Sequence, residues 1–321
     1  MNYIYKIYKF LEFIMKNILA FLAVVEANSF TKASESMHLT QPAVTKRIAN
    51  LENQFNTKLF ERIGHRVVLT DAGCAFLPHA RAIYAEWQDA NHKIASFSDR
   101  VRGTLIIGCN NHIATHRLPS LLKTYKDQFP EVDYNFVFRT SNEVIDLVEN
   151  HQVELGFTSL PREIPMDIAV RKVWKNDMRV VLSASHPFFK RKNDIISRLS
   201  NIPLISPEKL NIYHDILEDI RKYYSINSKI ISNINMLETI RKMVEAEIGW
   251  SIFPKHLIDD KLREIPFMKK RFYADLACIS HKKRELSRPA KEMINCINII
   301  IKNNPTKQSK NYNIFTSILI I

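Results

Sequence analysis

The chain has 321 residues and a formal net charge of +13, from 46 Lys and Arg against 33 Asp and Glu. This length favours two or more domains, because single hydrophobic cores rarely grow beyond about 250–300 residues. With 46% hydrophobic and 25% charged residues, the composition excludes a disordered or fibrous protein. The positive charge suggests a polyanionic partner, although net charge bears on encounter rather than on fold.

The four cysteines are far apart and form no C-x-x-C pair: Cys74, Cys109, Cys278 and Cys296. This spacing argues against a disulfide framework and a zinc ribbon, and it predicts a reducing, cytoplasmic compartment. No uninterrupted apolar run reaches the roughly 18 residues that a membrane span needs, so we expect no membrane association.

The N-terminus carries a weak likeness to a signal peptide, because two lysines precede an apolar stretch over residues 10–25. Three charged residues, Glu12, Lys16 and Glu26, interrupt or end that stretch, and no small-residue cleavage site follows. We therefore expect no signal peptide. Met15 opens a more ordinary start, and we interpret residues 1–14 as a possible N-terminal extension.

Three helices are predicted next. The apolar residues from Ile18 recur at helical spacing, Ser29 precedes a second short helix, and Thr40 caps a third that runs to about Asn53. Pro42 suits a first turn, because its missing N–H would be unpaired there anyway. Two short helices with a tight turn and a polar, basic outer face on the second form a helix-turn-helix, which can enter the DNA major groove. An ordinary three-helix bundle with a solvated polar face explains the periodicity as well.

Residues 59–70 predict a strand, a turn at Gly64 and a second strand. Such a hairpin, or wing, would carry Arg62, His65 and Arg66. A wing beside a recognition helix normally meets phosphates or the minor groove, so the hairpin favours the DNA-binding interpretation.

The segment from Ser29 to Gly73 resembles the winged helix-turn-helix of LysR-type transcriptional regulators. The matching runs are SFTKA at 29–33, LTQPAVTK at 39–46, LE at 51–52, KLFER at 58–62 and LTDAG at 69–73. The family usually has Ser-Arg where Thr45 and Lys46 stand, and often Gly where Asn56 stands. Taken with the chemistry of the side chains, the resemblance implies contacts with double-stranded promoter DNA from Thr31, Lys32, Thr40, Gln41, Pro42, Thr45, Lys46, Asn50, Arg62, His65 and Arg66.

The next segment has an apolar heptad pattern with alternating spacings of four and three residues. It predicts one linker helix over about residues 72–98 that pairs with the same helix of a second copy. The apolar residues of this pattern form a seam that could also pack against its own chain. The family resemblance favours pairing, and hence a homodimer or homotetramer, through Phe76, Ala80, Ile83, Trp87, Ala90, Ile94 and Phe97.

From residue 104 to 302, strands alternate with helices, which predicts parallel βαβ units. Predicted strands cover 104–109, 132–138, 154–158, 179–183, 203–206, 229–232, 250–253 and 272–279; helices cover a segment around 118–125, then 142–150, 208–223, 237–247 and 288–302. This region resembles the LysR-type effector domain, two α/β lobes similar to periplasmic binding proteins. The fold class is therefore multidomain: an all-α winged helix-turn-helix with a long linker helix, followed by a two-lobed α/β effector-binding domain. The predicted boundaries are 15–72 for the DNA-binding domain, 73–101 for the linker, 102–162 with 265–302 for the first lobe, and 163–264 for the second.

Polar residues follow successive predicted strands. Ligands in such folds bind where strand ends and helix N-termini converge, because free N–H groups attract anions. Ordinary helix capping is the alternative explanation for each residue taken singly. We expect a small organic acid as effector, with no other cofactor, held by Asn110, Asn111, His112, Thr140, Ser141, Asn142, Thr158, Ser159 and Ser206, with Phe253 and Pro254 as an apolar wall.

Cys109, His112 and His116 have a spacing that could bind zinc, but no fourth ligand is evident, so we expect no metal. No G-x-S-x-G, P-loop, H-E-x-x-H or dinucleotide fingerprint is present, so we do not expect an enzyme. The favoured interpretation is a transcriptional regulator that also contacts RNA polymerase, as the family resemblance implies. The alternative is a small-molecule binding protein whose DNA module has lost its function. Residues 303–321 are expected to form a polar linker and an apolar tail.

Overall fold

The computed structural model describes residues 2–64, 66–95, 100–191, 193–209 and 211–303. The predictions made for His65, Phe97 and residues 304–321 lie outside this range. The chain divides into two compact units. The first holds the N-terminal 98 residues with two short segments, 150–152 and 284–286, and the second holds the remainder. Each unit is described by itself.

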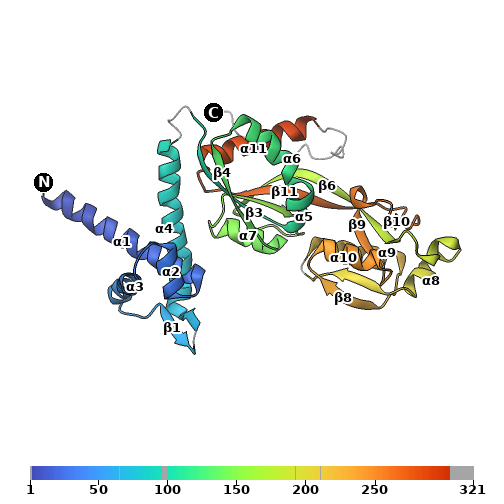
Figure 1. Ribbon diagram of the computed structural model, residues 1–321, viewed down its shortest axis with the longest axis horizontal. Helices are drawn as coiled ribbons and strands as arrows, with labels where there is room; N and C mark the ends of the chain where they lie inside the picture. The colour runs from blue at the N-terminus through green and yellow to red at the C-terminus, as the bar shows by residue number, and fades with distance from the viewer. Residues whose placement is uncertain (1, 65, 96–99, 192, 210, 304–321) are drawn as a thin grey trace. The chain divides into compact units, whose positions relative to one another are not determined.

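The first unit contains four helices and one hairpin: α1 (Asn2–Ala27), α2 (Phe30–Ser36), α3 (Gln41–Phe55), β1 (Phe60–Ile63), β2 (Arg66–Leu69) and α4 (Asp71–Ala95). The helix predicted from Ile18 begins much earlier, because residues 2–14 continue α1 instead of forming a separate extension. Figure 1 shows the first turns of α1 projecting beyond the bundle that it forms with α2 and α3.

Local sequence signals explain most of these boundaries. Ser29 caps α2, its side chain accepting a hydrogen bond from the Lys32 N–H at 3.3 Å. Thr40 stands at the N-cap of α3, but its side chain makes no capping bond, so this part of the prediction is wrong. Asn56 ends α3 with a φ of +50°, the left-handed conformation that Asn tolerates better than most residues. Gly64, with a φ of +63°, turns the hairpin.

One apolar core holds this unit together. Phe21 of α1, Val44 and Leu51 of α3 and Leu59 before β1 are almost completely buried in it. Each such side chain contributes roughly 1.5–3 kcal/mol relative to an exposed one. The Phe21 ring packs 5.2 Å from that of Phe60, which ties the wing to the helices.

The second unit contains the remaining elements: β3 (Gly103–Cys109), α5 (Asn111–His116), α6 (Leu118–Gln128), β4 (Val132–Phe138), α7 (Ser141–Glu149), β5 (Leu155–Ser159), β6 (Ile168–Ser183), η1 (Pro187–Lys190), α8 (Ile195–Ser200), β7 (Leu204–Pro207), α9 (Ile212–Tyr224), β8 (Ile230–Ile234), α10 (Leu237–Glu245), β9 (Ser251–Pro254), η2 (Lys255–Leu257), β10 (Leu262–Glu264), β11 (Phe272–His281) and α11 (Arg288–Asn303).

The main sheet has the order β10-β6-β11-β5-β3-β4, with β9 also paired to β6. β3 is parallel to β4 and β5, as expected, but β11 is antiparallel to both β5 and β6. The prediction of purely parallel units is therefore wrong for this part of the sheet. The reason is that β6 runs from the first lobe to the second and β11 returns beside it in the opposite direction, which makes the two strands antiparallel.

β6 is the element that joins two lobes. Its residues 168–178 pair with β11, and its residues 178–183 pair with β9 and β10. The first lobe comprises β3–β5, α5–α7 and α11 with the paired parts of β6 and β11. The second lobe comprises β7–β10 and α8–α10 with the end of β6, and its β7 and β8 form a separate parallel pair. Figure 1 shows the two lobes connected by these long strands.

No single helix within the described residues is long and apolar enough to cross a membrane. One pair of helical segments, Glu12–Ala27 with Phe30–Ser36, passes by length and composition together, but it is bent by 118°.

Candidate functional site

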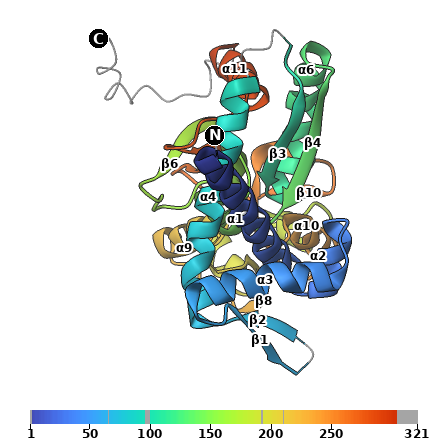
Figure 2. The ribbon, with the colours of Figure 1, turned by 90° about the vertical axis from the view of Figure 1, so that its left-hand side faces the viewer.

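The predicted recognition helix, α3, has one buried and one exposed face. Val44, Ile48 and Leu51 are buried against the core of the first unit. The opposite face is exposed and polar, and Figure 2 shows α3 close to the β1–β2 hairpin. Most of the residues predicted to bind DNA are exposed, and Asn50 is half-buried: Thr31, Lys32, Thr40, Gln41, Pro42, Thr45, Lys46, Asn50, Arg62 and Arg66. Their side chains offer amide, hydroxyl, ammonium and guanidinium donors, the groups that bind DNA phosphates and base edges.

Glu52 fixes the wing to the recognition helix, a role that the sequence pattern did not suggest. Its carboxylate is 8% exposed and accepts a hydrogen bond from the Leu59 N–H at 3.0 Å and a longer one from the Phe60 N–H at 3.5 Å. It also pairs with Lys58 at 2.6 Å. A buried carboxylate on α3 thus determines where β1 begins.

The predicted seam on α4 divides into two parts. Its first part, Phe76 and Ala80, packs into the core of its own unit. For these two residues the alternative prediction holds, in which the apolar pattern packs against its own chain. Further along, Ile83, Trp87 and Ile94 are 44%, 54% and 70% exposed, and Ala90 is exposed as well. An apolar face that includes a half-exposed tryptophan is available to a partner helix.

A cavity of about 490 Å³ lies between the two lobes of the second unit. That volume is within the range of small-molecule sites. The first lobe lines it with residues at or just after the ends of β3, β4 and β5, and the second with residues at or just after the ends of β7 and β8, as strand-end sites require. Seven of the predicted effector-binding residues line it: Asn110, Asn111, His112, Thr140, Ser141, Asn142 and Ser159.

Asn110 links the ends of β3 and β5 to the start of α7 at this cavity. Its side-chain oxygen accepts a hydrogen bond from the Ile113 N–H at 2.9 Å and so caps α5. Its amide nitrogen donates to the hydroxyls of Ser141 at 3.0 Å and Ser159 at 3.3 Å. The capping explanation therefore holds for Asn110, and the same side chain brings the polar ends of β3, α7 and β5 into one place.

Four predicted residues do not line the cavity. The Thr158 side chain is buried and donates to the carbonyl of Ser141 at 2.9 Å, and that of Ser206 donates to the carbonyl of Pro207 at 2.8 Å. Phe253 is fully buried in an apolar cluster with Ile205 and Ile240, and Pro254 is buried in β9. The apolar wall expected from these two residues is thus part of the core, because α10 covers the end of β9.

Several lining residues were missed by the sequence analysis. The predicted helix over 208–223 begins only at Ile212, which leaves a loop after β7 to face the cavity. The turn after β8 does the same. The strand-end rule predicts Ser206 at this edge of the sheet, and it extends to both loops once the helix begins at Ile212. The missed residues are Arg139, Glu143, Pro207, Glu208, Lys209, Asn211, Tyr213, Ile234, Asn235, Met236, Leu237, Glu238 and Ile240.

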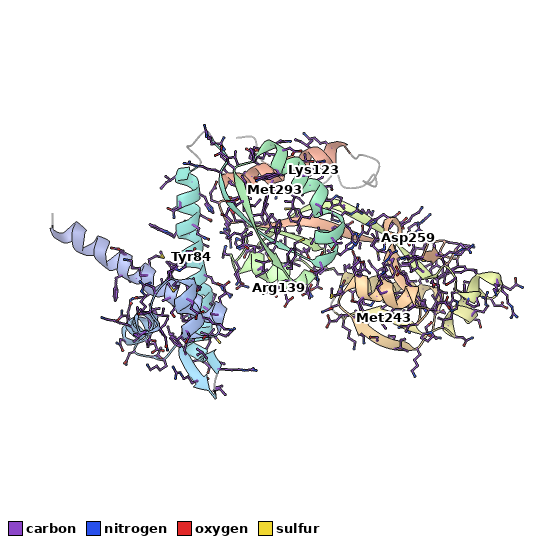
Figure 3. The ribbon with its side chains drawn as sticks, in the orientation of Figure 1. Tyr84, Lys123, Arg139, Met243, Asp259 and Met293 are labelled. Carbon is purple, nitrogen blue, oxygen red and sulfur yellow. The ribbon has the colours of Figure 1, made fainter. Side chains whose placement is uncertain are left out.

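The cavity lining carries charges of both signs. Arg139, labelled in Figure 3, follows β4 on the first lobe, and Lys209 follows β7 on the second. Of the acidic residues, Glu143 accepts hydrogen bonds from the Thr140 N–H at 2.9 Å and the Thr140 hydroxyl at 2.7 Å, and these bonds lower its pKa. Glu238 pairs with His116 at 2.7 Å across the two lobes. Two of the lining carboxylates are thus engaged by protein donors.

The histidines and cysteines near the cavity do not converge on one point. The Cys109 thiol contacts the carbonyl of Asn110, while His112 and His116 turn to Asn176 and Glu238. Within the described ranges, no group of three or more His, Cys, Asp or Glu side chains is placed to hold a metal ion. All four cysteines are free thiols.

Two protein-family models match the chain. Residues 15–74 match the bacterial regulatory helix-turn-helix protein of the lysR family, and residues 98–298 match the LysR substrate binding domain. A probable RuBisCO transcriptional regulator of Cyanophora paradoxa is 25% identical over 74% of this chain and 75% of its own. An uncharacterized HTH-type transcriptional regulator of Bacillus subtilis, YxjO, is 27% identical over 79% of this chain and 85% of its own.

Solved structures share the fold. A full-length OxyR variant from Pseudomonas aeruginosa has a TM-score of 0.70 at 16% identity, covering 93% of this chain and 98% of that one. CbnR, a LysR family transcriptional regulator, has a TM-score of 0.63 at 19% identity, covering 89% and 99%. The two family matches together span most of the sequence, and the chain therefore belongs to the LysR family of transcriptional regulators.

Proposed function

We propose that this regulator binds double-stranded promoter DNA through α3 and the β1–β2 wing as a homodimer or homotetramer, and that a small organic acid in the inter-lobe cavity controls that binding. The observation that carries the effector half of the proposal is the lining of the cavity. Residues of both lobes contribute to it, so a ligand held there would contact both lobes at once.

An acidic effector is supported by the elements around the cavity. The first turns of α7, α9 and α10 contribute lining residues, and helix N-termini favour anions through their unpaired N–H groups. Arg139 and Lys209 add positive side chains. Glu143 accepts a hydrogen bond from Thr140 and Glu238 pairs with His116, so both carboxylates are directed at protein donors.

Pairing of two copies is supported by the exposed apolar face of α4. Two paired linker helices would place two recognition helices on one partly palindromic DNA site. CbnR has been solved in complex with its target DNA, which supports DNA as the partner of the same fold here. We further propose that the regulatory output passes through contact with RNA polymerase in the cytoplasm, and we assign no enzymatic reaction to the chain.

The DNA-binding half is tested by gel shift of the full-length protein with its own upstream region at several salt concentrations. Gln41→Ala should weaken binding by about 1–3 kcal/mol and relax the preference at one base pair. Glu61→Ala, an exposed wing substitution that removes negative charge, should leave the base preference unchanged. An unaltered binding profile for Gln41→Ala would show that α3 does not read the sequence.

The effector half is tested by a thermal-shift screen of small carboxylic acids against the full-length protein, because a ligand of the folded state raises apparent stability. An acid that binds in the cavity should lose its effect in Ser141→Trp, which fills the space beside Asn110. Stabilisation that survives this substitution would place the binding site elsewhere.

A further inference from the structure

Two short segments from the effector-domain part of the sequence belong to the first compact unit. Residues 150–152 lie between α7 and β5, and residues 284–286 lie between β11 and α11. They meet the linker helix α4 around a buried ion pair between Arg284 and Asp89. Neither DNA binding by α3 nor ligand binding in the cavity requires this pair.

The ion pair is buried and completely hydrogen-bonded. Arg284 is 8% exposed and Asp89 is 7% exposed. Nε of Arg284 lies 3.2 Å from Oδ1 of Asp89. Its Nη1 donates to the carbonyl of His151 at 3.2 Å, and its Nη2 donates to Oε1 of Gln88 at 3.2 Å. The second oxygen of Asp89 accepts a hydrogen bond from the N–H of Glu285 at 3.0 Å, so every polar atom of both charged groups has a partner.

Asp89 lies on the face of α4 opposite to the exposed apolar face. Residues two positions apart differ by about 200° around a helix, so the side chain of Asp89 points away from that of Trp87. Ala85, one turn before Asp89, is 3% exposed, whereas Trp87 is 54% exposed. The ion pair can therefore form in the same molecule whose Trp87 face pairs with a second copy.

A buried ion pair of this kind specifies a position more than it adds stability. Removing both charges from water costs much of the energy that their attraction gains, whereas separating them leaves an uncompensated buried charge. If α4 rotated or moved by one turn, Asp89 and Arg284 would separate, and the guanidinium would also lose its bond to Gln88. The pair thus selects one position of α4 against residues 150–152 and 284–286.

The same two segments lead directly into the strand that reaches the cavity. Ser287, the residue after the second segment, donates to the buried carboxylate of Glu154 through its N–H at 2.8 Å and its hydroxyl at 2.9 Å. Glu154 immediately precedes β5, whose five residues are all buried. Ser159, the last residue of β5, lines the cavity. One short, buried strand therefore extends from the segments beside the ion pair to the proposed effector site.

We propose that Arg284 is a positioning residue: its ion pair with Asp89, the latch, holds α4 to the segments before β5 and after β11, and it couples the linker helix to the cavity through β5. The inference rests on the proposed function, in which a ligand in the cavity controls DNA binding. A ligand can do so only if the strand that it contacts is held to the helix that follows the DNA-binding domain. The apolar face of α4 then serves the second copy, and its polar face serves the effector domain.

The latch is tested by hydrogen–deuterium exchange of the ligand-free, full-length protein, measured by mass spectrometry of its peptides. In Arg284→Ala, the amides of residues 84–94 in α4 should exchange at least tenfold faster than in the wild type, and those of β3 should be unchanged. Arg162→Ala removes an exposed arginine that pairs with Asp219, and it should leave α4 at the wild-type rate. A wild-type rate for α4 in Arg284→Ala overturns the inference. Equal acceleration in β3 also overturns it, because Arg284 would then support the fold in general.

A double substitution distinguishes a pair from two independent residues. Asp89→Ala alone should accelerate exchange in α4 as Arg284→Ala does. The double variant should exchange no faster than the faster single variant, because either change already breaks the latch. Arg284→Lys keeps the positive charge and should exchange at least threefold more slowly than Arg284→Ala. Multiplied effects in the double variant, or equal rates in the two Arg284 variants, overturn the inference.

Coupling is tested with a DNA duplex of the chain's own upstream region as the added ligand, because coupling between two sites is reciprocal. In the wild type, saturating duplex should slow exchange in residues 150–159 and 284–287 at least threefold. In Arg284→Ala, saturating duplex should leave both segments unchanged. Slowing that persists in Arg284→Ala overturns the inference, as does its absence from the DNA-bound wild type. If the duplex does not bind in a gel shift, the DNA-binding half of the proposed function fails, and the ligand-free exchange still decides whether the latch exists.

Discussion

Glu52 is a buried carboxylate whose removal should separate the wing from the recognition helix. In Glu52→Ala, the N–H of Leu59 loses its acceptor at 3.0 Å and stays buried next to a methyl group. The N–H of Phe60 also loses a longer contact of 3.5 Å. The neighbouring Thr70 still bonds to Leu59 and Lys58 through their carbonyls, so the hairpin remains closed while its anchor is lost.

The expected loss of stability follows from these contacts. A hydrogen bond from a buried N–H to a charged acceptor is worth about 1.5–3 kcal/mol. The bond at 3.5 Å is at the edge of useful geometry and adds little. The pair with Lys58, whose side chain is 76% exposed, adds at most about 1 kcal/mol. The sum is about 2–4 kcal/mol, which lowers the Tm of a domain of this size by roughly 10–20 °C.

Calorimetry of the full-length protein measures this shift in the transition of the DNA-binding unit. Glu52→Gln keeps an acceptor oxygen and should lose only about 1 kcal/mol. Glu61→Ala removes an exposed carboxylate from the same wing and should change stability by less than about 0.5 kcal/mol. The anchoring role predicts that the Tm of Glu52→Ala is lower than that of Glu61→Ala by roughly 10 °C or more. A difference of only about 2–3 °C between the two variants would refute it.

Three further outcomes are expected. Gly73→Ala should destabilise the DNA-binding unit by about 3 kcal/mol in denaturant unfolding, because its Cβ would overlap the carbonyl oxygen of Leu59; an unchanged midpoint would contradict this packing. Trp87→Glu should shift the protein toward monomer in analytical ultracentrifugation, and a dimer of unchanged affinity would exclude the exposed face of α4 as the interface. Acidification from pH 7 to 5 should destabilise the wild type by about 2 kcal/mol more than His112→Gln, because the unfolded histidine takes up a proton below its ordinary pKa of 6.5 while the folded one stays neutral to about 3; equal losses would contradict this burial.

The winged helix-turn-helix could be predicted closely because its signals are local. Ser29, Pro42, Asn56 and Gly64 each suit one backbone geometry, and the structure places each of them there. α1 was predicted too short, because Met15 suggested an ordinary start and residues 1–14 a separate extension. Glu52 could not be found from sequence, since its role depends on backbone donors that a hairpin brings to it from seven residues away.

The effector domain was harder because its long strands and its cavity depend on distant segments. The first half of β6 carries Arg171, Lys172 and Lys175, which hide a strand that pairs with β11 over residues 168–178. Strand ends predicted the polar residues of the first lobe well. They could not show that Phe253 would be covered by α10, because burial at a strand end depends on which helix packs over it.

Control of DNA binding by a ligand requires that the ligand distinguish two arrangements of the protein. A molecule that contacted only the first lobe would bind both arrangements equally and would shift neither. The cavity avoids this limit, because nine of its lining residues come from the first lobe and eleven from the second. The His116–Glu238 pair already holds the lobes at one edge without a ligand, and Asn176 joins them at the back. Partial closure reduces the binding free energy that a ligand must supply to close the lobes fully. The apparent affinity rises with the fraction of molecules that are already competent to bind. A modest number of new contacts would then be enough to change the balance between arrangements.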